Sequence, residues 1–339
     1  MSTLSESAYT REGTGGDTRT DGCTLTLQPN ATWAAQPAPL LSVLVPFYET
    51  SPLTLLRALI AQATSVPSAV ELIFADDGSR DPQHRRAVMD ELARCDRPAA
   101  VLVASSNIGR ASIRNALTRA SRGRYLLYID CDLMPGETDF LARWAEIAAA
   151  GETDVCYGGF RMRPREEVPD RLHAYYSARS DCLPAAERQR EPAKYTYTNN
   201  LLVARQVALA EPFDERFTGW GWEDVEWALR VDRHWPIRHV ENPVLNPADG
   251  SARSLLRKFS ESVGNFALLR HLHPAEVAKF PIFRVSRVLA VLPLLSATLP
   301  LLEIVAVDTH EIFPMQLRYL ALKLYRACLY GTAHDIDEA

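Results

Sequence analysis

The sequence predicts a doubly wound α/β fold with a mostly parallel sheet, followed by a helical C-terminal extension. Four short, nearly uninterrupted apolar runs each end on polar residues, which is typical of strands buried on both faces of a parallel sheet. Segments with helical start and stop signals lie between these runs and give the rhythm of βαβ units. The chain has 339 residues, 47% of them apolar, which is enough to bury a sizeable core.

The expected elements alternate in order. Strands are expected at residues 41–47, 70–74, 99–104 and 124–129, and helices at 52–64, 82–94 and 110–122. Ser51 and Asp81 each precede a proline, so each is expected to start a helix as its N-cap. Gly123 is expected to end the third helix. Because ligands bind at the carboxyl ends of the strands in such sheets, the polar residues after each run mark the expected site.

The two ends of the chain differ from this pattern. Residues 1–38 are rich in Ser, Thr, Gly and Pro, and we expect a poorly ordered tail. In the second half, a strand is expected at 154–160 and helices near Glu223 and at 251–272, with the stretch YTYTNNLLVA at 195–204 between them.

Two segments near the C-terminus leave alternatives open. Residues 288–307 are mostly apolar and long enough to span a bilayer, but two prolines and Glu303 weaken that interpretation. Packed or interfacial helices are favoured over a membrane-surface contact, and a true span comes last. Residues 317–329 repeat apolar residues at helical spacing between basic ones. Such a helix either lies on anionic lipid or presents a solvated face over a core stripe.

Composition and charge exclude several classes of protein. The formal net charge is −5, so no basic surface suggests a nucleic-acid partner. The six cysteines form no C-x-x-C pair, and scattered cysteines are typical of a reducing compartment. The N-terminus lacks the layout of a signal peptide. We therefore expect a cytoplasmic protein. Because its net charge is negative, it would bind an anion through local features such as helix N-termini, a few arginines or a metal ion.

Two acidic motifs follow expected strands. Asp130-Cys131-Asp132 comes directly after RYLLYI, and two carboxylates at this spacing can hold one divalent cation together with water and phosphate oxygens. Asp76-Asp77-Gly78-Ser79 also stands at a strand end, where an Asp can accept hydrogen bonds from a base or a ribose. A solvated pair in the first case and an Asx-type turn in the second are the simpler interpretations.

Two further motifs stand at expected helix starts. Residues 107–115 read NIGRASIRN, with a glycine for close approach and two arginines one turn apart, an arrangement that can hold a diphosphate. Neither G-x-G-x-x-G nor G-x-x-x-x-G-K-[ST] is present, which disfavours dinucleotide oxidoreductases and P-loop enzymes. Residues 219–226 read GWGWEDVE, which places two flat apolar rings, suited to sugar faces, beside two carboxylates. A helix cap with core tryptophans is the alternative.

Taken in order, these stretches resemble the family 2 inverting glycosyltransferases with the GT-A fold. The similarity runs from about residue 40 to 245 through SVLVPFYE, FADDGSRD, NIGRASIRN and YIDCD. GWGWEDVE is similar to the acidic segment of chondroitin-polymerase-like and β-1,4-galactosyltransferase-like enzymes. The resemblance implies a GT-A domain at 39–250, with a nucleotide-binding half at 39–135 and an acceptor and catalytic half at 136–250. The tail is then 1–38 and the helical extension 251–339.

The resemblance also implies roles for individual residues. Asp224 would be the general base, Glu223 would orient hydroxyl groups, and Asp132 would bind Mn²⁺ or Mg²⁺, with Asp130 and His239 as further candidate ligands. Trp220, Gly221 and Trp222 would frame the acceptor and sugar sites. The nucleotide-sugar donor would be bound by Pro46, Tyr48, Glu49, Asp76, Asp77, Asn107, Arg110, Arg114, Asp130 and Cys131.

One position departs from the family pattern. Many relatives have a His as a further metal ligand downstream of the acidic pair, and this chain has Asn246 there, with His239 and His234 nearby. The ionisation of the expected base is also open. A helix N-terminus would lower the pKa of Asp224, whereas burial beside Trp222 and Glu223 would raise it.

The implied activity is metal-dependent, inverting transfer of a hexosyl or hexosaminyl group. The expected donor is a UDP-sugar, and the expected acceptor is a glycan or lipid-linked glycan in surface-polysaccharide synthesis. The protein would be cytoplasmic, with a peripheral contact to the inner face of the membrane through its C-terminal helices. An inactive sugar-nucleotide-binding module and a nucleotidyltransferase are the alternatives.

Overall fold

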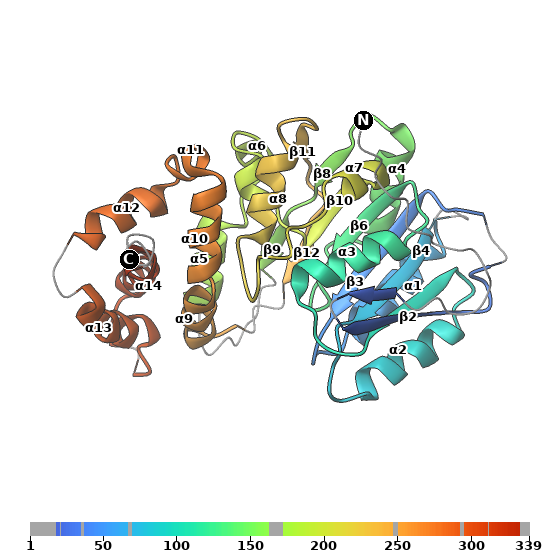
Figure 1. The fold of residues 1–339 in the computed structure, drawn as a ribbon, viewed down its shortest axis with the longest axis horizontal. Coiled ribbons are helices and arrows are strands. Elements are labelled where there is room, and N and C mark those ends of the chain that lie inside the picture. The colour runs from blue at the N-terminus through green and yellow to red at the C-terminus, as the bar shows by residue number, and fades with distance from the viewer. Residues whose placement is uncertain are drawn as a thin grey trace.

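The computed structural model describes residues 18–20, 22–34, 37–66, 70–162, 172–246, 250–291, 295–310 and 312–332. A large sheet forms the core of the first two thirds of this part of the chain (Figure 1). Its strands are β1 (Thr18–Thr20), β2 (Cys23–Pro29), β3 (Leu41–Phe47), β4 (Val70–Asp76), β5 (Ala99–Ala104), β6 (Tyr125–Ile129), β8 (Val155–Tyr157), β10 (Asn200–Ala204) and β11 (Ile237–His239). Their spatial order is β1-β2-β5-β4-β3-β6-β10-β8-β11.

The four central strands, β5, β4, β3 and β6, are parallel and confirm the strands expected from the apolar runs. In β3, Val43 pairs with Leu72 of β4 on one side and Leu127 of β6 on the other, and all three side chains are fully buried. Burial on both faces explains why these strands are apolar without alternation.

Helices cover both faces of the parallel strands. On one face α1 (Leu53–Ala63) packs against α2 (Gln83–Ala93) and α4 (Phe140–Ala150). On the other, α3 (Arg110–Ala120) packs against β3, β4 and α7 (Arg205–Ala210). The strand order reverses between β3 and β6, so the carboxyl ends of these two strands form the topological switch point, and such folds bind ligands in the crevice at that point.

Two expectations about where strands lie were wrong. The expected tail contains β1 and β2, and β2 pairs antiparallel with β5, with Cys23 and Leu25 buried against the core. The strand expected at 154–160 is divided by Gly158 and Gly159, the latter with φ 80°, into β8 of the large sheet and β9 (Phe160–Met162). β9 joins β7 (Met134–Pro135) and β12 (Val244–Asn246) in a small second sheet. The short elements α5 (Leu172–Ser180), α6 (Ala185–Arg188) and η1 (Ala193–Tyr195) follow it along the chain.

The C-terminal extension is helical, as expected. After α8 (Glu223–Val231), the segment expected as one helix at 251–272 is two, α9 (Ala252–Glu261) and α10 (Val263–Leu272). The remaining helices are α11 (Pro274–Val277), α12 (Pro281–Ala290), α13 (Leu295–Val307) and α14 (Met315–Thr332). Figure 1 places α12 and α13 at the end of the molecule farthest from the parallel strands, packed against α14. Within the described ranges, no helix has the length and apolar character needed to cross a bilayer.

Candidate active site

Two arginines at the start of α3 bring two acidic side chains together. Arg110 and Arg114 lie one helical turn apart on the same face. Arg114 donates to Asp130 Oδ1 at 2.9 Å and to Glu223 Oε1 at 3.4 Å, and Arg110 Nε donates to Glu223 Oε1 at 2.9 Å. The arginines therefore join the carboxyl end of β6, which supplies Asp130, to the first turn of α8, which supplies Glu223.

Burial makes this ion-pair cluster electrostatically strong. The side chains of Arg114 and Glu223 are 2% and 3% exposed. Desolvation would raise the pKa of Asp130, but Arg114 and Arg110 outweigh it, and the pKa of Asp130 is lowered. Arg114 Nε and Glu223 Oε2 are buried without a hydrogen-bond partner among the described residues. These two atoms are therefore candidates for a hydrogen bond to a ligand bound in the crevice.

The conformation of the chain before α8 sets the direction of the two acids. Gly219, Gly221 and Trp222 all have left-handed φ values, of 72°, 91° and 73°. Such a backbone is strained for tryptophan, and strain of this kind often accompanies functional sites. α8 begins immediately afterwards, so Glu223 and Asp224 lie in its first turn.

Asp224 is the acid with the most perturbed ionisation in this cluster. Its Oδ1 accepts a hydrogen bond of 2.9 Å from Thr198 Oγ1. Burial, followed by the neighbouring Glu223 carboxylate, raises the pKa of Asp224 to about 7, against the opposing effect of Arg114 and Arg110. The side chain is therefore suited to exchange a proton near neutral pH.

Asp132 is the candidate metal ligand that the structure leaves free. Its side chain is exposed, and apart from its own backbone N–H no hydrogen-bond or ion-pair partner of the carboxylate is found in the described part of the chain. Desolvation by the surrounding chain, and then the Asp130 carboxylate, raise its pKa. The half-buried Cys131 beside it points to no chemistry of its own, because burial and the two flanking acids raise its thiol pKa to about 12.

Asp76, the last residue of β4, and Asp77, which follows it, both accept hydrogen bonds from other groups of the protein. Asp76 is fully buried and accepts from Ser79 N at 2.9 Å and from Arg85 Nη1 at 3.0 Å. Asp77 accepts from the backbone N–H groups of Ile108 and Gly109. Their carboxylates therefore stabilise the loops around the crevice. This favours the interpretation of the motif as an Asx-type turn.

Neighbouring residues at this edge join the same loop structure. Asn107 Nδ2 donates to Asp77 Oδ2 at 3.0 Å. The Glu49 carboxylate accepts from Arg80 N at 2.9 Å, which links the loops after β3 and β4. Pro46 is half-buried in β3, whereas Tyr48 is 40% exposed at its carboxyl end. Tyr48 is thus the member of this group with an open ring face beside the switch point.

The tryptophans of the glycine loop differ from expectation. Trp222 faces the C-terminal extension: its ring stacks on Phe280, and its Nε1 donates to Tyr330 Oη at 2.9 Å. Gly221 is held there too, because its carbonyl accepts from Asn265 Nδ2 at 2.8 Å. Trp220 is half-buried against the hydrophobic cluster that includes Phe259. The core-tryptophan interpretation is therefore the better one for Trp222.

His239 is not available as a metal ligand in this structure. Its Nδ1 accepts from Arg188 Nη1 at 3.1 Å, and its Nε2 lies 3.2 Å from the Pro192 carbonyl, which can only accept. Desolvation, and then Arg188, lower the pKa of His239 to about 4. More broadly, the described residues contain no group of three or more His, Cys, Asp or Glu side chains arranged to hold a metal ion.

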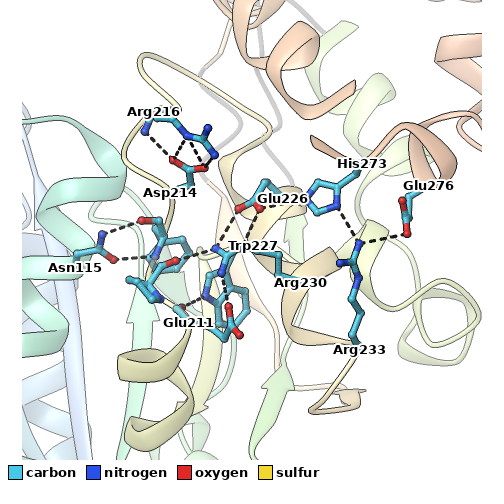
Figure 2. A network of polar contacts seen from close by, with 12 residues as sticks. Asn115, Glu211, Asp214, Arg216, Glu226, Trp227, Arg230, Arg233, His273 and Glu276 are labelled. Carbon is cyan, nitrogen blue, oxygen red and sulfur yellow. Dashed lines mark hydrogen bonds and ion pairs between the residues drawn. The ribbon is translucent and has the colours of Figure 1, made fainter. Parts of the chain in front are cut away.

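A second polar network on the far side of α8 was missed from the sequence (Figure 2). Glu226 accepts from Arg230 Nε at 2.7 Å and lies 3.1 Å from His273 Nε2. Arg233 contacts both His273 and Glu276, so the network ties α8 to α10 and α11. Thr198 was also missed. It follows no pattern of its own, since only folding brings it to Asp224.

A doubly wound sheet with acidic and basic side chains gathered at its switch point matches the fold of the GT-A class of glycosyltransferases. Residues 42–208 match the model of "Glycosyl transferase family 2", which supports the assignment of this domain to the family 2 glycosyltransferases. The match covers β3 to β10 and ends before α8.

Similar proteins support the same assignment. Validoxylamine A glucosyltransferase from Streptomyces hygroscopicus subsp. limoneus is 28% identical over 229 residues, covering 59% of this chain and 49% of that protein. The uncharacterized glycosyltransferase EpsJ of Bacillus subtilis is 29% identical over 141 residues, covering 40% of this chain and 39% of that protein. The chain thus spans about half or less of the length of these relatives.

The fold is that of a solved mannosyltransferase. The structure of PcManGT from Pyrobaculum calidifontis, in complex with GDP-Man and Mn²⁺, aligns with a TM-score of 0.52 at 16% identity and covers 88% of this chain and 91% of that one. At this identity the similarity shows the fold alone. It extends across the helical C-terminal region as well as the sheet.

Proposed function

We propose that this protein is an inverting, metal-dependent glycosyltransferase. It moves a hexosyl or hexosaminyl group from a nucleoside diphosphate sugar, with UDP as the expected carrier, to a glycan or lipid-linked glycan in surface-polysaccharide synthesis. The observation that carries the proposal is the cluster of Glu223 and Asp130 bound to Arg110 and Arg114 at the switch point, with Asp224 within electrostatic range of all four. The glucosyltransferase relative and the GDP-Man complex of the structural neighbour support a nucleotide-sugar donor.

The reaction would be a single in-line displacement. An acceptor hydroxyl oxygen bonds to the anomeric carbon of the donor while the bond from that carbon to the diphosphate oxygen breaks, and the leaving group keeps the electron pair. Asp224 takes the hydroxyl proton as the new bond forms. Glu223 keeps one oxygen free of protein partners and can accept a hydrogen bond from a sugar hydroxyl. Arg110 and Arg114 offset the charge that grows on the diphosphate.

The donor set fits a hard divalent cation. Mg²⁺ and Mn²⁺ are commonly bound by one or two carboxylates together with water and substrate phosphates. Asp132 offers an unengaged carboxylate at the end of β6, whereas Asp130 is already bound by Arg114. A bound cation would supply electrostatic stabilisation of the leaving diphosphate. Asp132 would be its main protein ligand.

The extension would hold the protein at an anionic membrane surface. Among the described residues, most of the exposed large apolar side chains belong to α12, α13, α14 and their adjoining turns. They are Val285, Val288, Val291, Leu301, Ile304, Ile312, Leu317 and Leu320. Arg284 and Arg287 are exposed on α12 beside the valines. Residues 251–332 carry ten Lys and Arg against five Asp and Glu, although the whole chain is acidic. Exposed apolar groups among basic ones fit an anionic lipid surface.

A sedimentation assay with lipid vesicles tests the membrane contact. The full chain is expected to pellet with phosphatidylcholine vesicles containing phosphatidylglycerol and to stay in solution with pure phosphatidylcholine. Val288→Asp/Val291→Asp should abolish pelleting, whereas Met89→Asp, at an exposed site on α2, should not. Equal pelleting of both variants, or a dimer that the valine changes dissociate without any lipid binding, would overturn this part of the proposal.

A donor panel tests the transfer reaction. The protein is incubated with UDP-glucose, UDP-N-acetylglucosamine or GDP-mannose, with Mn²⁺ or with EDTA, and the release of nucleoside diphosphate is measured. We expect release with at least one donor, dependent on the metal and lost in Asp224→Asn. Calorimetry on the same donors should show that the variant still binds. If no donor binds or reacts, the proposed function is wrong.

A further inference from the structure

One cation near the site comes from outside the family domain. Lys258 lies on α9, in the C-terminal extension, and its side chain is half-buried. Its Nζ lies 5.7 Å from the ring centroid of Trp220, close enough for a cation–π contact. It also acts electrostatically on both Asp130 and Asp132. The extension therefore places a positive charge beside the two acids at the carboxyl end of β6.

Lys258 differs from the two arginines of the cluster because it is uncommitted. Arg110 and Arg114 already bind the carboxylates of Asp130 and Glu223. The ammonium group of Lys258 makes no hydrogen bond or ion pair to any residue that the structure describes. Its three N–H donors are free for a ligand, and lysine is a common point-charge partner of phosphate.

We propose that Lys258 binds the diphosphate of the donor, so that the extension completes the donor site. This inference rests on the proposed function. The crevice already holds Asp130, Asp132, Glu223 and Asp224, and a diphosphate adds further negative charge. A cation with free donors that acts on both Asp130 and Asp132 offsets that charge. The cation–π contact with Trp220 places the ammonium group near the loop that precedes Glu223 and Asp224.

The neighbouring arginine provides a matched control. Arg257 precedes Lys258 on α9 but is exposed, and its only described partner is Glu261 at 3.7 Å, one turn along the same helix. A change of Arg257 to Met removes one positive charge and shortens one long side chain of the same helix. It therefore reproduces any general effect of net charge or helix stability without touching the crevice.

The experiment measures how binding depends on the phosphates. Calorimetry compares UDP, UMP and uridine, or GDP, GMP and guanosine if GDP binds the wild type better, with Mn²⁺ present. Lys258→Met is expected to weaken diphosphate binding about tenfold, which matches the loss of one charged hydrogen bond, and to leave nucleoside binding unchanged. Lys258→Arg should keep most of the affinity, and Arg257→Met all of it.

Two results would overturn the inference. Unchanged diphosphate affinity in Lys258→Met would remove the lysine from the donor site. An equal loss for the nucleoside and the diphosphate would make its role purely structural. A wild-type protein that binds none of these nucleotides would contradict the proposed function itself, which separates that failure from a failure of the lysine assignment.

Discussion

The parallel-strand half (residues 39–135) and the C-terminal extension contact the start of α8 in opposite ways. From the parallel-strand half, Arg110 and Arg114 bind Glu223 through buried charges. From the extension, Tyr330 and Phe266 pack on Trp222, the residue just before Glu223, through rings and one neutral hydrogen bond. Charged contacts respond to pH and ligand, and ring contacts do not. The charged contacts to Glu223 and the ring contacts to Trp222 are thus made at adjacent residues at the start of α8.

The largest expected effect concerns the charged side. Asp224→Asn should keep the hydrogen bond from Thr198 but remove the proton acceptor, so kcat should fall about 10²–10⁴-fold while donor affinity stays close to wild type. Steady-state kinetics and calorimetry measure the two quantities. Asp139→Asn, on the surface in an ion pair with Arg143, is the control and should leave both unchanged. A variant that loses donor binding as well would place Asp224 in the donor site.

The second prediction compares stability across the two regions. Arg114→Met leaves Asp130 and Glu223 without their buried partner and should lower the free energy of unfolding by about 3–5 kcal/mol. Arg326→Met removes a cation whose hydrogen-bond partners are the neutral hydroxyls of Tyr330 and Tyr176, and should cost about 1–3 kcal/mol. Urea unfolding at neutral pH measures both. The reverse ranking would show that the extension, rather than the ion pairs, holds α8.

The third prediction addresses the aromatic side. Trp222→Phe keeps a ring but loses the hydrogen bond to Tyr330, which should cost about 1 kcal/mol of stability. Because Glu223 and Asp224 follow directly, kcat should fall several-fold with an unchanged KM for the donor. Trp235→Phe, in a half-buried tryptophan elsewhere on the main core, is the control for loss of an indole. Equal kinetic effects in both variants would contradict a role for Trp222 in positioning the acids.

The smallest effect is a pH dependence. As a base, Asp224 must be ionised, so with its pKa at about 7 the rate should fall about tenfold per pH unit below that value. Stability should change in the opposite sense. The folded protein retains a proton that the unfolded chain has lost, so unfolding free energy should decrease as pH rises from about 4 to about 7. Thermal unfolding of wild type and Asp224→Asn across this range measures the difference, which the Asn variant should lack.

The parallel strands and the clustered acids were predictable because a short stretch of sequence is enough to indicate each of them. Strands buried on both faces are continuous apolar runs, and the polar residues that end them meet at one edge of the sheet. β2 was missed although Cys23, Leu25 and Leu27 alternate with threonines, which is the signal of a half-buried strand. Composition alone had suggested a tail.

The direction of Trp222 and the ionisation of Asp224 could not be predicted. The rings that receive Trp222 lie some forty to a hundred residues further along the chain, so no local pattern points to them. The pKa of Asp224 depends on how deeply its side chain is buried and on which charges surround it, and only the packed structure decides that. The prediction of His239 as a metal ligand was wrong for a related reason. The sequence shows an imidazole but not the Pro192 carbonyl and the Arg188 guanidinium that contact its two nitrogens.

The antiparallel pairing of β2 with β5 has a consequence for handling this protein. Without β2, the outermost parallel strand would present a row of unsatisfied N–H and C=O groups to solvent, a template on which another chain can assemble. A polypeptide that begins at residue 42, where the match to the family starts, would therefore be prone to self-association, even though every acid and arginine of the crevice was retained.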